Sequence, residues 1–255
     1  MIGLALNRLQ KSKRASAPTL PEGMRVYAIG DVHGRLDLLR ELADKISGDL
    51  HSASASQINA IFLGDYVDRG PQSAAVIEEL AQGVFPVPVV ALRGNHEDIL
   101  LRFLEDESVL DSWRKFGGLE TLHSYGVSVA DPIRGGGYKA ARDAFRQAIP
   151  ESHVQFLKNT SPSVSFGDYF FCHAGVKPGV PLELQSTQDL LWIRDEFLEY
   201  PGAFGKVVVH GHTPTPVPEQ RFNRINIDTG AYATSKLTAL VLEGDQRYFL
   251  STGSE

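Results

Sequence analysis

Aspartate, asparagine and histidine side chains gather in five short, glycine-containing segments of this 255-residue chain. In chain order the segments read GDVHG at 30–34, GDYVDRG at 64–70, GNHE at 94–97, HAG at 173–175 and HGH at 210–212. Carboxylate and amide oxygens and imidazole nitrogens are ligands that hard and borderline metal ions prefer. The segments therefore predict a metal site, provided that the fold brings them together.

The first three segments each follow a short apolar run and precede a stretch with helical spacing. We predict strands at 24–29, 58–63 and 87–92, and helices at 36–46, 73–80 and 97–105. This alternation is typical of βαβ units, which form a parallel sheet. Ligands bind beyond the carboxyl ends of the strands in such sheets, so we expect the polar residues to converge on one site.

The whole chain is interpreted as one α/β domain at 23–255 that follows a flexible tail at 1–22. Residues 106–150 are less regular and contain several glycines, and we interpret them as a helical insertion in that domain. Beyond the insertion the pattern turns to β structure. We predict further strands at 166–173, 206–210, 224–227, 236–242 and 246–250.

The composition, with 42% hydrophobic and 22% charged residues, is that of an ordinary globular protein. The net charge of −6 gives no support for a nucleic-acid partner. The N-terminal apolar stretch is too short for a signal peptide or a membrane span, and a single cysteine excludes an internal disulfide. We therefore expect a cytoplasmic protein without a membrane or nucleic-acid partner. A monomer is compatible with the sequence, which leaves the oligomeric state open.

The ordered motifs GDVHG, GDYVDRG, GNHE, HAG and GH resemble the phosphoprotein phosphatase branch of the calcineurin-like metallophosphoesterases. The resemblance runs from Gly30 to His212, with further similarity to about Gly230. The segment IDTGAY at 227–232 is similar to bacterial members of that branch and differs from the eukaryotic ones. The resemblance implies two packed, mixed β-sheets flanked by helices.

The resemblance also implies two metal ions, with Mn²⁺ expected and Fe or Zn compatible, and hydrolysis by direct attack of a metal-bound hydroxide. The implied ligands are Asp31 and His33 for the first ion, Asp65 as the bridge, and Asn95, His173 and His212 for the second. The implied catalytic residues are His96 as general acid, Asp68 as the group that orients it, and Arg69 and Arg194 as phosphate-binding groups.

General chemistry agrees with these roles. Two ions about 3.5–4 Å apart can share a water molecule and lower its pKa from about 15.7 toward 7. A bridging ligand needs two oxygens, so Asp65 suits the bridge, whereas the amide of Asn95 suits a terminal position. The planar fork of an arginine matches the geometry of a phosphate.

Some positions have a second interpretation. Arg194 follows the segment LLWI at 190–193 and is either a phosphate ligand or an arginine on a solvated face. His210 is favoured as a core residue over a site residue. Asp228 either supports a metal-bound histidine or belongs to a turn, and Cys172 is interpreted as a core residue.

Three functions are compatible with these motifs. The main one is a phosphatase acting on phosphoproteins, as a protein serine/threonine phosphatase does, or on small phosphomonoesters. The first alternative is a symmetrical dinucleoside tetraphosphate hydrolase, and Asp68 in the second motif favours the phosphatase over it. The second alternative is a non-catalytic binding or scaffold protein on the same fold. The complete set of implied ligands and acid argues against that alternative.

Overall fold

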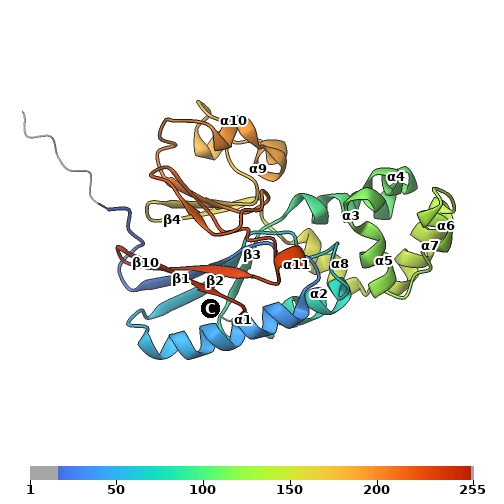
Figure 1. Ribbon diagram of the computed structural model, residues 1–255, viewed down its shortest axis with the longest axis horizontal. Coiled ribbons are helices and arrows are strands. Elements are labelled where there is room, and N and C mark those ends of the chain that lie inside the picture. The colour runs from blue at the N-terminus through green and yellow to red at the C-terminus, as the bar shows by residue number, and fades with distance from the viewer. Residues whose placement is uncertain (1–16, 254–255) are drawn as a thin grey trace, which may run out of the picture.

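The computed structural model describes residues 17–253, whose strands form two five-stranded sheets packed face to face (Figure 1). The first sheet has the order β10-β9-β1-β2-β3, with β1 at Met24–Ile29, β2 at Gln57–Phe62, β3 at Val89–Ala91, β9 at Thr238–Glu243 and β10 at Gln246–Ser251. The second has the order β4-β5-β6-β8-β7, with β4 at Ser163–Phe166, β5 at Tyr169–Cys172, β6 at Val207–His210, β7 at Glu219–Gln220 and β8 at Arg224–Asn226.

Both sheets are mixed, as the family resemblance implies. Strands β1, β2 and β3 are parallel, and β9 joins them antiparallel to β1. In the second sheet β5, β6 and β8 are parallel. The predicted strand at 24–29 has the bounds of β1, and the other predicted ends of the βαβ region lie close to the observed ones. The parallel strands therefore present their carboxyl ends on the same side of the molecule.

Strand β1 is buried on both faces, which explains its unbroken apolar character. Its side chains alternate: Val26 and Ala28 point into the core between the two sheets, whereas Tyr27 and Ile29 belong to the core beneath the helices. Its neighbour β2 alternates in the same way near its carboxyl end. The polar residues that follow β1 and β2 are consequently anchored by strands that are packed on both faces.

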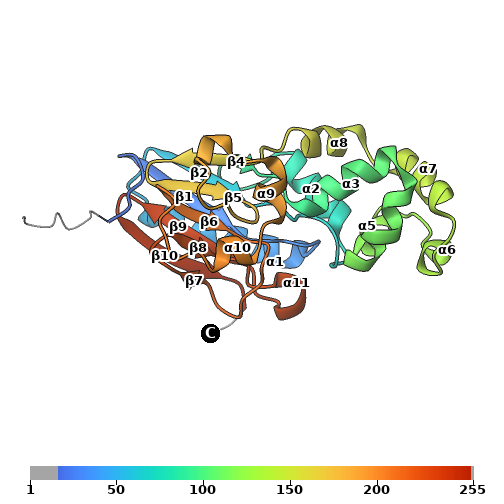
Figure 2. The same ribbon diagram turned by 90° about the horizontal axis from the view of Figure 1, so that it is seen from above.

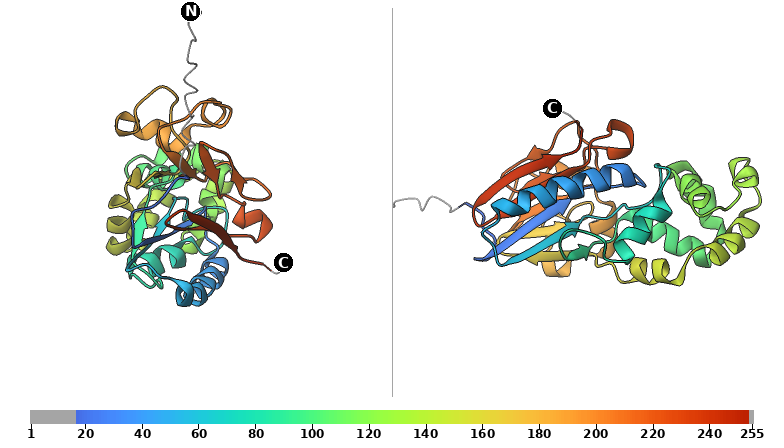
Figure 3. Two further views of the ribbon diagram at one scale, coloured as in Figure 1. Left: turned by 90° about the vertical axis from the view of Figure 1, so that its left-hand side faces the viewer. Right: turned by 90° about the horizontal axis from the view of Figure 1, so that it is seen from below.

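Helices cover the outer faces of both sheets. Helix α1 at Leu36–Asp49 lies along the outer face of the first sheet, as the view from below shows (Figure 3). Helices α2 at Ser73–Ala81, α3 at Asn95–Glu105 and α8 at Glu151–Lys158 bury residues in the same core. The short helices α9 at Thr187–Trp192 and α10 at Asp195–Leu198 cover the second sheet.

The segment at 106–150 extends the molecule beyond the strand ends, on the right in Figures 1 and 2. It contains α4 at Leu110–Trp113, α5 at Gly118–Ser124, α6 at Ala130–Ile133 and α7 at Tyr138–Ala148. An aromatic cluster joins it to the domain, because Trp113 and Phe145 pack against Phe103 of α3. Helix α11 at Ala231–Thr234 is the last helix, between β8 and β9.

The structure corrects three sequence-based expectations. The strand predicted at 166–173 is a hairpin of β4 and β5, because Gly167 adopts a φ of 53° in the turn between them. Helix α8 follows the insertion directly, where β structure was expected. Leu20 is buried between the sheets and Thr19 donates its backbone N–H to Asp168, so the packed domain begins before residue 23. Residues 1–16 of the expected tail lie outside the described part of the chain.

Within residues 17–253, no helix combines the length and the apolar character that crossing a membrane requires.

Candidate metal centre

Loops at the ends of the parallel strands carry the site, and their backbone is strained. Six non-glycine residues of the described chain have a positive φ, and five of them belong to the predicted site: His33, Asp65, Asp68, Arg69 and His212. This region of φ costs energy for residues with a side chain, and such residues persist where the surroundings hold them. The strain is thus concentrated where the sequence predicts chemistry.

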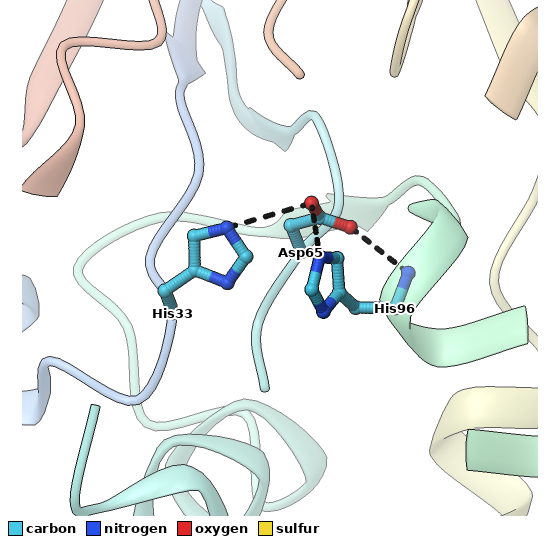
Figure 4. Close-up of side chains that lie close together, drawn as sticks. All are labelled: His33, Asp65 and His96. Atoms are coloured by element: carbon cyan, nitrogen blue, oxygen red, sulfur yellow. Dashed lines mark hydrogen bonds and ion pairs between the residues drawn. The ribbon is translucent and has the colours of Figure 1, made fainter. Parts of the chain in front are cut away.

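Asp65 lies at the centre of the arrangement. Its Oδ2 atom is 3.5 Å from His33 Nε2, 3.4 Å from His173 Nε2 and 3.7 Å from His96 Nε2. Figure 4 shows the carboxylate between the rings of His33 and His96. Two groups of ligand atoms, one with His33 and His96 and one with His173 and His212, are each compact enough to hold an ion, and they share Asp65.

Two histidines are oriented by backbone carbonyls. His33 Nδ1 donates to Val67 O at 2.8 Å, and His173 Nδ1 donates to Leu63 O at 3.0 Å. Because these bonds occupy Nδ1, the lone pair of a neutral ring remains on Nε2, which faces the carboxylate of Asp65. Outer hydrogen bonds of this kind fix the tautomer of metal-binding histidines.

The second group of ligand atoms has acceptors facing one another. His173 Nε2 lies 2.9 Å from Asn95 Oδ1 and 3.1 Å from His212 Nδ1. The Nε2 atom of His212 is buried and has no hydrogen-bond partner within residues 17–253. Burial and the neighbouring His173 lower the pKa of His212 to about 2, so this ring is neutral. A cation placed among His173 Nε2, Asn95 Oδ1 and His212 Nδ1 would relieve the contact between these acceptors.

Three buried carboxyl groups, those of Asp31, Asp65 and Asp228, lie in the same region. Burial, followed by the charges of Asp228 and Asp65, raises the pKa of Asp31 well above its usual range. Burial opposes ionisation of Asp65, but the neighbouring His173 and His96 lower its pKa well below the usual range. Buried like charges need compensation, and a pair of cations supplies it. The donor set therefore fits a dinuclear metal centre.

Asp31 stands slightly apart from the two groups of ligand atoms. Its carboxylate accepts the backbone N–H of His212 at 3.1 Å, and it is not among the mutually close ligand atoms. His96 is among them, although the sequence assigns it to proton transfer. Asp228 accepts the N–H of Gly230 at 2.9 Å and bonds to no histidine in the described chain, which fits the turn interpretation.

His96 is paired with Asp68. Its Nδ1 atom lies 2.5 Å from Asp68 Oδ2, and because a carboxylate can only accept, Nδ1 carries the proton of this bond. Burial disfavours the charged ring, but Asp65 and Asp68 together raise the pKa of His96 to about 9. Bound cations would offset part of the Asp65 contribution. The pair thus presents Nε2 toward Asp65 as a potential proton donor.

The two arginines differ in how firmly they are held. Arg69 Nη2 lies 3.4 Å from His96 Nε2, and its guanidinium stacks 4.6 Å from the ring centroid of Tyr232. Arg194 is exposed, and its charge contributes to the lowered pKa of His212. His210 is fully buried and packs against Phe197, away from the ligand atoms.

Sequence reasoning missed Glu97, which organises the loop after β2. Its buried carboxylate accepts the backbone N–H groups of Asp65 and Tyr66 at 2.8 Å, and that of Gly94 at 2.9 Å. It lies at the third position of α3, where a glutamate commonly bonds back to the residue before the helix. The GNHE motif contains this capping signal, which could have identified the residue.

Comparison with known proteins identifies the family. A model of the family described as calcineurin-like phosphoesterase matches residues 24–243. The chain belongs to the calcineurin-like phosphoesterase family. The two-sheet fold is therefore that of a metallophosphoesterase, which is a hydrolase, and the paired groups of ligand atoms could hold a dinuclear metal centre.

Two curated relatives align with most of the chain. A protein of Oceanobacillus iheyensis named bis(5'-nucleosyl)-tetraphosphatase PrpE, asymmetrical, is 27% identical over 85% of this chain and 88% of its own length. A Bacillus anthracis protein of the same name is 29% identical over 85% of this chain and 90% of its own length.

Solved structures share the fold of this chain. A crystal structure of a protein provisionally named a diadenosine tetraphosphatase is 18% identical, covers 94% of this chain and 100% of its own, and has a TM-score of 0.63. A cold-active protein-tyrosine phosphatase of a Shewanella species is 15% identical, covers 91% of this chain and 83% of its own, and has a TM-score of 0.56. At these identities the likeness concerns the fold alone.

Proposed function

We propose that this chain hydrolyses dinucleoside tetraphosphates asymmetrically at a centre of two metal ions. The observation that carries the hydrolytic part is the position of Asp65, whose carboxylate is shared by two groups of histidine ligands. Asp31 and His33 would hold one ion, and Asn95, His173 and His212 the other. Such a pair supplies Lewis acidity and a water molecule of lowered pKa next to the phosphorus atom.

The chain's own groups would then bind and orient the substrate. Arg69, held over the ring of Tyr232, would bind phosphate oxygens through its planar fork. The exposed Arg194 would make a second such contact. The oxygen of water adds to phosphorus as the bond to the leaving oxygen breaks, and His96 Nε2 would donate a proton to that oxygen where protonation is needed.

The names of the curated relatives support the nucleotide substrate. Both PrpE proteins align with 85% of this chain and carry the asymmetrical tetraphosphatase name. These names favour the dinucleoside tetraphosphate hydrolase over the phosphoprotein phosphatase as the interpretation of the sequence. The alternative expected from the sequence is a symmetrical hydrolase, whereas both names specify asymmetrical cleavage. Asymmetrical cleavage breaks the P–O–P bond next to a nucleoside, so the products are a nucleoside monophosphate and a triphosphate.

The His96–Asp68 pair favours a second candidate, a phosphomonoesterase that acts on phosphoproteins or small esters. A phosphate leaving group departs readily as an anion at neutral pH, whereas the alkoxide of a serine side chain needs a proton. An oriented acid at 2.5 Å from its aspartate is therefore most useful for an alcohol leaving group.

A substrate comparison with Mn²⁺ present tests the proposal. We expect a higher kcat/KM for diadenosine tetraphosphate than for a phosphoserine peptide or for p-nitrophenyl phosphate. Chromatography of the products should resolve equimolar AMP and ATP. Two equivalents of ADP would instead establish symmetrical cleavage, and a higher kcat/KM on the phosphopeptide would establish the second candidate.

A further inference from the structure

The helical insertion contacts the catalytic loop at Asp68. Two buried side chains of the insertion bond to this carboxylate: Trp113 Nε1 donates to Asp68 Oδ2 at 2.6 Å, and Thr121 Oγ1 donates to Asp68 Oδ1 at 2.6 Å. The hydroxyl oxygen of Thr121 also accepts the backbone N–H of Asp68 at 2.9 Å. Asp68 is fully buried, so these bonds are shielded from water.

Both carboxylate oxygens of Asp68 are thereby fixed. Oδ2 accepts from Trp113 and from His96 Nδ1, while Oδ1 accepts from Thr121. A carboxylate with three donors in fixed directions cannot rotate without losing at least one bond. Its φ of 72° shows that the backbone is equally constrained.

The connection between α4 and α5 is shaped for this contact. Gly118 lies under the indole of Trp113, where a β-carbon would come within 2.5 Å of the ring. The preceding residue, Gly117, accepts the backbone N–H of Arg69 at 3.2 Å. The insertion therefore holds the backbone next to the phosphate-binding arginine as well as the aspartate beside the acid.

We propose that Trp113 and Thr121 are positioning residues that act through Asp68 to orient His96 for proton transfer to the leaving group. The inference rests on the proposed hydrolytic function, in which His96 is the general acid. It gives the insertion a definite role, which is to hold the carboxylate of Asp68 in a fixed orientation beside His96.

The variants Trp113→Phe and Thr121→Val test this role because each removes a donor and keeps much of the shape. Their kcat is expected to fall about tenfold on an alkyl phosphate, which needs the acid, and to change little on p-nitrophenyl phosphate, whose phenolate leaves unaided. Thr121→Ser keeps the hydroxyl and should restore most of the rate. In a His96→Asn background, Trp113→Phe should have no further effect on kcat.

Phe145→Leu is the matched control, since Phe145 packs in the same aromatic cluster and its side chain carries no group that can hydrogen-bond to Asp68. It should lower the thermal midpoint without any dependence on the leaving group. If Trp113→Phe lowered kcat equally on both substrates, Trp113 would have only a packing role, and the inference would be overturned. The inference would also be overturned if Trp113→Phe and Thr121→Val hydrolysed the alkyl phosphate at the wild-type rate while His96→Asn lost more activity on the alkyl phosphate than on p-nitrophenyl phosphate. If His96→Asn lost the same factor in kcat on both substrates, His96 would not be the general acid, and the inference would fail with that assignment.

Discussion

Replacing Asp65 with asparagine should nearly abolish turnover while the chain remains folded. The amide oxygen can still accept the backbone N–H of His96, as Asp65 Oδ1 does now at 3.2 Å. The shared negative charge between the two groups of histidine ligands is lost, so neither ion would be held correctly and the nucleophile would not form. We expect kcat to fall by more than the factor of about 10²–10⁴ that a general acid contributes.

The measurement for Asp65→Asn combines rate, metal content and circular dichroism. Asp143→Asn is a matched control, because it makes the same chemical change at a partly exposed position of α7, where Asp143 pairs with Lys139. That control should retain wild-type rate and metal content. Wild-type turnover in Asp65→Asn would remove Asp65 from the site.

The second large effect is expected for His96→Asn, and it should depend on the leaving group. Loss of the acid should lower kcat about 10²–10⁴-fold on a serine phosphate and much less on p-nitrophenyl phosphate. The metal content should stay near wild type if His96 donates a proton and does not ligate. Asp68→Asn should show the same dependence with a smaller loss, because it orients His96 without donating the proton itself.

His51→Asn serves as the control for His96→Asn, since His51 is exposed and, within residues 17–253, hydrogen-bonds to the nearby Gly48 carbonyl. The alternative outcome is informative because His96 also lies close enough to Asp65 to be counted with its ligand atoms. Loss of metal together with equal losses on both substrates would make His96 a ligand, and the proton donor would have to be sought elsewhere.

Local patterns predicted most of the elements that position the site. The apolar run at 24–29 and the helical spacing after residue 36 are signals carried by neighbouring residues, and both agree with β1 and α1. The hairpin of β4 and β5 was missed because the turn signal Gly167-Asp168 lies inside the single strand predicted to begin at Phe166. The short α9 and α10 are stabilised by packing on the second sheet, which no local pattern reveals.

The partners of Asp68 could not be predicted for a different reason. Trp113 and Thr121 are 45 and 53 residues away in the chain, and an indole or hydroxyl in a helix gives no signal of such a distant bond. The substrate class is equally hidden, because the strand-end motifs describe the hydrolytic centre and leave the surfaces that bind a nucleotide or a peptide unspecified. The sequence thus predicts the hydrolytic reaction better than the class of substrate.

The most direct test of the two-ion account is a titration of chelated, metal-free protein with Mn²⁺. Calorimetry and elemental analysis should find close to two equivalents of ion per chain, and hydrolysis should develop only as the second site fills. His173→Ala should reduce the bound metal toward one equivalent, because it removes a ligand from only one of the two groups. Full turnover by protein that contains no metal would contradict the account at its centre.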